Sequence, residues 1–298
     1  MTNVWRLRMK SGKPDVHATQ ARAFAFDNGW VGAGWGLDES VHNNSLVDGS
    51  TDVAAYRRLA NDVFPGDASF ERALATIGSQ MTEGDYCWAY DSYTGEYWCA
   101  KVEGGFQYRQ GGEFDRYDFH MVRPCTWARA GTADAVPGAI RRAFAGPFGT
   151  ITSLKADKDR IIGAAKNALG ECDPPKANDL FEATGPEDLE DLVALYLQGK
   201  GWRIYPSTAK VTMASYEFIV VHEKSGERAG VQVKSGAVSR VDQGVAEGFQ
   251  RFFVFVAGAN PKVGGDERLT VITRREILDF ALRNVDLLPL RLLRSWTP

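Results

Sequence analysis

The second half of the chain alternates apolar segments and turn residues in an order that restricts its fold. The segment from Pro186 to Gln198 has proline at its start and acidic residues in its first turns, which favours a helix. Strand-like segments follow at 202–206, 216–222, 229–235 and 251–257, with a helical crossover around 240–249 and a final strand and helix within 269–284. This order predicts a mixed sheet flanked by helices.

Two neighbouring strands of this predicted sheet carry an acid, an amide and an amine. Glu217 lies in one strand, and Gln232 and Lys234 lie two residues apart in the next, so these two share a face. Oxygen ligands suit Mg²⁺, and a lysine can position water or offset the charge that builds on a phosphate. The pattern predicts a nuclease centre, although a Gln-x-Lys triplet also occurs by chance on solvated strands.

Together with the upstream helix, the pattern resembles the Mrr-like branch of the PD-(D/E)XK restriction-endonuclease superfamily, over about residues 181–284. Leu189 stands where that branch usually has phenylalanine, and Glu217 where aspartate is commoner. The resemblance implies a catalytic role for Lys234, which would orient the attacking water. It also implies bound Mg²⁺ or Mn²⁺, whose ligands would come from Glu217, Gln232, the carbonyl of Val233, and Glu190.

The first half of the chain is β-rich by pattern. Strands are expected at 4–10, 26–36, 85–91, 97–103 and 118–128, and helices within 51–80. This pattern predicts a small β-barrel with helical insertions, followed by a breaker-rich stretch. We therefore expect a two-domain α+β or α/β protein, with a first domain at 1–152, a helical linker at 153–180 and a second domain at 181–298.

Tryptophan is concentrated in the first half, where six of the eight precede residue 130. With the neighbouring glycines, this half resembles the PUA-like group of small barrels, which includes EVE and YTH domains, over about residues 1–128. The resemblance implies a pocket in which aromatic faces stack on an extruded base and polar groups read its edge. The alternative is that most of these tryptophans fill the barrel interior. The candidate pocket residues are Trp30, Trp35, Trp88, Asp85 and Asn28.

The charge of the chain limits how it can bind nucleic acid. A net charge of −3 and a pI of about 5.9 count against generic coating of DNA, because such proteins are usually basic. Any affinity for DNA is expected to come from local patches. We find no apolar run of membrane-spanning length and no secretory signal, so we expect a cytoplasmic protein without a membrane partner.

These features together predict a modification-dependent DNA endonuclease that resembles type IV restriction enzymes. It would read a base such as 5-methylcytosine in double-stranded DNA by base flipping, and hydrolyse phosphodiester bonds with a divalent metal. Since one centre cuts one strand, a homodimer is expected. Two alternatives stay open: a reader of modified DNA or RNA whose nuclease fold is inactive, and an enzyme that acts on RNA.

Overall fold

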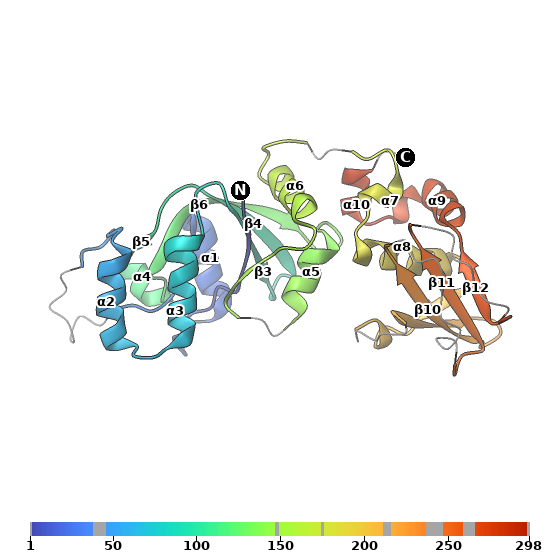
Figure 1. Cartoon of the computed structure of the whole chain (residues 1–298), viewed down its shortest axis with the longest axis horizontal. Helices are drawn as coiled ribbons and strands as arrows, with labels where there is room; N and C mark the ends of the chain where they lie inside the picture. The colour runs from blue at the N-terminus through green and yellow to red at the C-terminus, as the bar shows by residue number, and fades with distance from the viewer. Residues whose placement is uncertain are drawn as a thin grey trace. The chain divides into compact units, whose positions relative to one another are not determined.

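The computed structural model describes residues 2–37, 46–146, 149–173, 176–210, 216–236, 247–258 and 266–296. By its internal contacts the chain divides into two units, residues 1–174 and 175–298. Each unit combines a β-sheet with helices and has its own buried core (Figure 1).

The first unit is built on a seven-stranded sheet that curls into a half-barrel. The strand order is β2-β6-β4-β3-β1-β7, and β5 pairs with β6. In the described part of the chain, β2 and β7 end this path and β5 has β6 as its one strand partner, so the sheet stays open where the sequence predicted a barrel. The strands are β1 (Val4–Leu7), β2 (Trp30–Ala33), β3 (Tyr86–Asp91), β4 (Glu96–Val102), β5 (Gln107–Tyr108), β6 (Met121–Gly131) and β7 (Ile151–Ser153).

Helices cover this sheet in separate groups. They are α1 (Ala18–Asn28), α2 (Val53–Val63), α3 (Ala68–Leu74), α4 (Gly112–Tyr117), α5 (Gly138–Ala145) and α6 (Lys158–Ala168). Residues 26–28 were expected in a strand, but they form the end of α1. Gly29, with φ at 70°, ends this helix, and β2 begins at Trp30.

The segment 153–180, which the sequence predicted as a linker, contributes largely to the first unit. Its first residue, Ser153, ends β7 and pairs with Trp5 of β1, and α6 buries Ile161 and Ala165 against the sheet. Beyond α6, Glu171 accepts hydrogen bonds from the Tyr86 hydroxyl and the Lys101 amine, both at 2.7 Å. These contacts attach the segment to β3 and β4.

The second unit has a five-stranded sheet in the order β12-β11-β10-β9-β8. β10, β11 and β12 run parallel, and β9 is antiparallel to both of its neighbours. The expected strands correspond to β8 (Trp202–Ile204), β9 (Phe218–His222), β10 (Arg228–Lys234), β11 (Arg251–Val256) and β12 (Leu269–Ile272). Most of the expected crossover at 240–249 lies outside the described residues.

The helices of the second unit are α7 (Leu180–Ala183), α8 (Pro186–Gly199), α9 (Arg274–Arg283) and α10 (Leu290–Ser295). Proline opens α8, and the Asp188 carboxylate accepts the Gly185 N–H at 3.0 Å. Leu189, Val193 and Leu197 recur at helical spacing, so α8 buries this face in the core. Across the described ranges, no helix combines the length and apolar character needed to cross a bilayer.

Candidate functional site

The nuclease candidate lies where β9 and β10 part. The ladder between them ends at the pair Val231 and Phe218, while β10 continues to Lys234 alongside β11. Glu217 stands one residue before β9, and its N–H donates to the Val231 carbonyl at 2.8 Å. The end of β10 therefore lies next to the acid that precedes β9.

The structure brings the side chains of Glu217 and Lys234 together. The Lys234 Nζ is 3.7 Å from the Glu217 Oε1, and both side chains keep contact with solvent, at 39% and 21% exposure. Ion pairs this accessible add only about 0–1 kcal/mol to stability. The contribution of this ion pair to the stability of the fold is therefore small, and a role of the two side chains in catalysis is compatible with it.

Gln232 projects to the same face as Lys234. In register with β11, Gln232 pairs with Val254 and Lys234 with Val256, so this face alternates with the one formed by Val231 and Val233. Gln232 is buried, at 7% exposure. One face of β10 thus carries an amide and an amine, and the amine approaches the acid.

Glu190 comes from another part of the second unit. It lies half-buried on α8, and α8 packs against the face that Val231 and Val233 form. This is the opposite face of the sheet from Gln232 and Lys234. The side chain of Val233 is buried in that core, so only its main chain could face the acid. The role of its carbonyl as a metal ligand stays a prediction.

The donor set of this group fits a hard divalent cation in part. Among the residues that the structure describes, no cluster of three or more His, Cys, Asp or Glu side chains could hold a metal. Mg²⁺, however, keeps several waters and often binds proteins through one or two carboxylates. Glu217, the Gln232 amide oxygen and the Val233 carbonyl are oxygen donors of the kind that Mg²⁺ or Mn²⁺ prefers.

The five residues proposed for a base pocket do not form one site. Trp88 and Asp85 lie in the interior, Trp35 lines one cavity, and Trp30 and Asn28 line another. Trp88 is fully buried between the sheet and helices α5 and α6, where it packs with Ile140 and Ile161. Asp85 is buried as well, and it accepts the Asn3 N–H at 2.6 Å and the Trp5 indole N–H at 2.9 Å. The two residues support the fold and do not line an open pocket.

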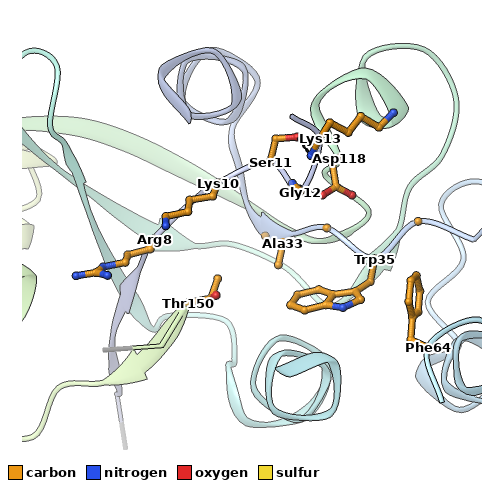
Figure 2. A pocket seen from close by; sticks show the side chains of 13 residues that line it. Arg8, Lys10, Ser11, Gly12, Lys13, Ala33, Trp35, Phe64, Asp118 and Thr150 are labelled. Carbon is orange, nitrogen blue, oxygen red and sulfur yellow. Dashed lines mark hydrogen bonds between the residues drawn. The ribbon is translucent and has the colours of Figure 1, made fainter. Parts of the chain in front are cut away.

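Trp35 lines a cavity of about 530 Å³ in the first unit (Figure 2). Trp35 and Phe64 lie on one side, and Arg8, Lys10 and Thr150 on the other. Three cations, Arg8, Lys10 and Lys13, line this cavity together with one acid, Asp118. Aromatic walls suit a flat ring, and a cationic border suits a negatively charged group attached to that ring.

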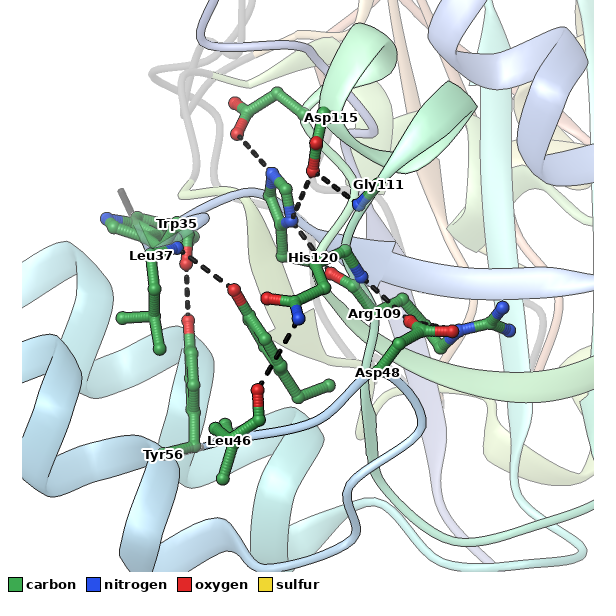
Figure 3. Close-up of polar contacts among 12 residues, drawn as sticks. Trp35, Leu37, Leu46, Asp48, Tyr56, Arg109, Gly111, Asp115 and His120 are labelled. Atoms are coloured by element: carbon green, nitrogen blue, oxygen red, sulfur yellow. Dashed lines mark hydrogen bonds and ion pairs between the residues drawn. The ribbon is translucent and has the colours of Figure 1, made fainter. Parts of the chain in front are cut away.

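Hydrogen bonds hold Trp35 in an unusual backbone conformation. Its φ is +67°, a region that residues other than glycine rarely adopt. The Tyr56 hydroxyl donates to the Trp35 carbonyl at 2.6 Å (Figure 3), and the Trp35 indole N–H donates to Asp67 at 3.1 Å. This hydrogen bond also lowers the pKa of Asp67. The surroundings thus fix the direction in which the indole points.

Trp30 and Asn28 line a second cavity of about 490 Å³. Here the guanidinium of Arg109 lies 5.2 Å from the Trp30 ring and 4.2 Å from the Phe114 ring. Arg109 also donates to Asp48 at 2.9 Å. Burial would raise the pKa of Asp48, but the hydrogen bonds from Arg109 and Gln110 outweigh it and lower the pKa. Arg109 therefore occupies the position beside Trp30 that a base would need.

His120 links the surroundings of the two cavities (Figure 3). Its ring is buried, and Nδ1 lies 2.8 Å from the Arg109 carbonyl. Burial lowers the pKa of His120, since it disfavours the charged ring. The Cα of Gly36 lies so close that a Cβ there would come within 2.3 Å of Nε2. His120 thus acts as a packing element beneath the segment that carries Trp35.

The basic residues of the Trp35 cavity did not figure in the sequence prediction. Their signal is the alternation along β1 and the three residues after it, in which Trp5, Leu7 and Met9 enter the core while Arg8 and Lys10 alternate with them. Asp118 has no comparable local signal, because Gly12, its partner, is 106 residues away in the sequence.

Comparison with known proteins adds no identification. No protein-family model matches the chain, and neither a curated protein nor a solved structure matches it. The functional conclusion therefore depends on the residues and their geometry.

Proposed function

We propose that the chain is a metal-dependent phosphodiester hydrolase that acts on DNA carrying a modified base such as 5-methylcytosine. The observation that carries this proposal is the 3.7 Å approach of Lys234 to Glu217 at the point where β9 and β10 part. A scissile phosphate needs a carboxylate-bound cation and a second positive charge at one place.

In this proposal each side chain of the group has a distinct task. Glu217 and the Gln232 amide oxygen, with the Val233 carbonyl, would hold Mg²⁺ or Mn²⁺. The bound ion would lower the pKa of a water molecule and neutralise phosphate charge. The Lys234 ammonium would orient the attacking water and stabilise the charge that builds on the phosphate oxygens. Glu190 would hold a second metal or a metal-bound water, and the placement of α8 on the other face of the sheet counts against this role.

The first unit would supply recognition of the modified base. The Trp35 cavity offers an aromatic face for an extruded base, and Arg8, Lys10 and Lys13 are suited to the phosphates on either side. This cluster also answers the difficulty posed by the net charge, since it is a local cationic patch on an acidic protein. We propose the Trp35 cavity as the pocket in preference to the Trp30 cavity, where Arg109 covers the ring.

Two further parts of the proposal concern assembly and location. One group of this kind cuts one strand, so cleavage of both strands would need a homodimer. The expected cytoplasmic location belongs to the proposal as well.

The test is cleavage of plasmid DNA with and without 5-methylcytosine. We expect cleavage of the methylated plasmid in the presence of Mg²⁺ or Mn²⁺, and none when the metal is chelated. Equal cleavage of the unmodified plasmid would contradict the dependence on modification. Structured RNA added as a competitor would show whether RNA is the preferred substrate.

A second function is a reader of modified DNA with an inactive nuclease fold. The placement of α8, which carries Glu190, on the other face of the sheet favours this alternative, because it leaves Glu217 as the acid of the group. If the protein binds methylated DNA but does not cleave it in the presence of Mg²⁺ or Mn²⁺, this second function is the correct one.

We predict that the double substitution Lys10→Ala and Lys13→Ala weakens DNA binding mainly through lost phosphate contacts. The slope of log K against log salt concentration should fall by about two, one for each contact. Fluorescence anisotropy at several salt concentrations measures this slope. The matched control is Lys155→Ala with Lys158→Ala, which removes two lysines of the same unit outside the cavity lining. An unchanged slope in the first variant would exclude these lysines from the DNA contact.

A further inference from the structure

Asp118 is the one acid among the described residues that line the Trp35 cavity. Its backbone is left-handed, with φ at 54°, and its Oδ2 accepts the Gly12 N–H at 2.6 Å. The carboxylate lies against Gly34, where a Cβ would come within 2.5 Å of Oδ2. These contacts hold the carboxylate in one orientation. Figure 2 shows Asp118 beside Gly12 at the cavity wall.

The second oxygen of this carboxylate, Oδ1, has the longer of the two contacts. Oδ1 lies 3.8 Å from the His120 Nε2, which is beyond hydrogen-bonding distance. The Asp118 side chain keeps 18% of its surface exposed. An ionised carboxylate only accepts hydrogen bonds, so this wall favours a ligand that presents an N–H group.

The other residues that line the cavity indicate which further groups a ligand would carry. Cations match phosphates, the Trp35 indole matches a flat ring, and Asp118 matches a donor on the edge of that ring. A nucleotide whose base carries an exocyclic amino group has all three features. Carboxylates accept hydrogen bonds from such an amine in the recognition of cytosine. Thymine presents a carbonyl oxygen at the equivalent position, and this oxygen would repel the carboxylate.

We propose that Asp118 selects bases with an exocyclic amino group, and so separates 5-methylcytosine from thymine in the Trp35 cavity. This inference rests on the proposed reading of an extruded base by the first unit. The two bases have the same methyl group, so the distinction depends on the amino edge and not on the methyl.

The test compares two DNA duplexes that differ at one base, 5-methylcytosine or thymine, placed opposite an abasic site. The base is unpaired in both duplexes, so differences in pairing energy do not enter. Fluorescence anisotropy without divalent metal measures affinity independently of cleavage. We expect the protein to bind the 5-methylcytosine duplex about tenfold more tightly than the thymine duplex.

The variant Asp118→Asn should bring this ratio towards one, because an amide can donate to the thymine carbonyl. Asparagine tolerates the left-handed backbone and can still accept the Gly12 N–H, so the fold should be retained, as a thermal melt would verify. Asp27→Asn, an exposed acid of α1, is the matched control and should leave the ratio unchanged.

Each outcome bears on a different claim. Equal affinity of the unaltered protein for the two duplexes, or an unchanged ratio in Asp118→Asn, overturns the role of Asp118 and leaves base reading intact. Failure to bind either duplex overturns base reading by this cavity, and the role of Asp118 with it.

Discussion

Replacement of Lys234 by alanine is expected to lower the rate of metal-dependent DNA cleavage by about 10²–10³-fold, the usual effect of removing one group that stabilises a transition state. The ammonium of Lys234 lies 3.7 Å from Glu217, so alanine removes a positive charge beside the proposed metal ligand. Because the pair is partly exposed, stability should change by no more than about 1 kcal/mol. Single-turnover cleavage of methylated DNA measures the rate.

The control for this experiment is Lys224→Ala, which removes an exposed lysine from the turn between β9 and β10. This variant should cleave DNA at the rate of the unaltered protein. DNA binding by Lys234→Ala should persist, since the proposed base cavity belongs to the first unit. Cleavage that continues undiminished in Lys234→Ala would remove Lys234 from the mechanism.

The second large effect concerns Trp88. We expect Trp88→Ala to lower the free energy of unfolding by about 3–5 kcal/mol, because it leaves a cavity in the buried layer beneath α5 and α6. Equilibrium unfolding in urea measures this change. Tyr93→Ala is the control, because the Tyr93 side chain is 80% exposed and its removal should change stability by only about 0.5 kcal/mol.

The Trp88 experiment also separates a structural role from a binding role. If the variant kept its stability but lost its affinity for methylated DNA, Trp88 would belong to the base pocket after all. A large loss of stability, with DNA binding retained at low temperature, is the result that the buried position predicts.

The sequence predicted the second sheet well because the signals there are local. The segments 216–222, 229–235 and 251–257 are short apolar runs bounded by turn residues, and they form β9, β10 and β11. The alternation that places Gln232 and Lys234 on one face follows from strand geometry alone. The approach of Lys234 to Glu217 requires two strands to pair in one register, which one sequence can suggest but not fix.

The first unit was harder to predict because its contacts are distant in the sequence. Asp85 follows a glycine and resembled a residue at a pocket edge, but its partners Asn3 and Trp5 lie about 80 residues earlier. Trp88 turns towards α5 and α6, which come later in the chain. Trp30, Trp35 and Trp88 thus belong to three different hydrophobic clusters, although all three lie in the tryptophan-rich half of the sequence.

The hydrogen bond from the Glu217 N–H to the Val231 carbonyl has a consequence for how heat would affect the chemistry. This bond and the ladder between β10 and β11 fix the backbone positions of Glu217 and Lys234 in the five-stranded sheet. Warming should therefore preserve the spacing of the two groups until the sheet itself melts. The temperature at which turnover collapses should then coincide with the melting temperature of the second unit.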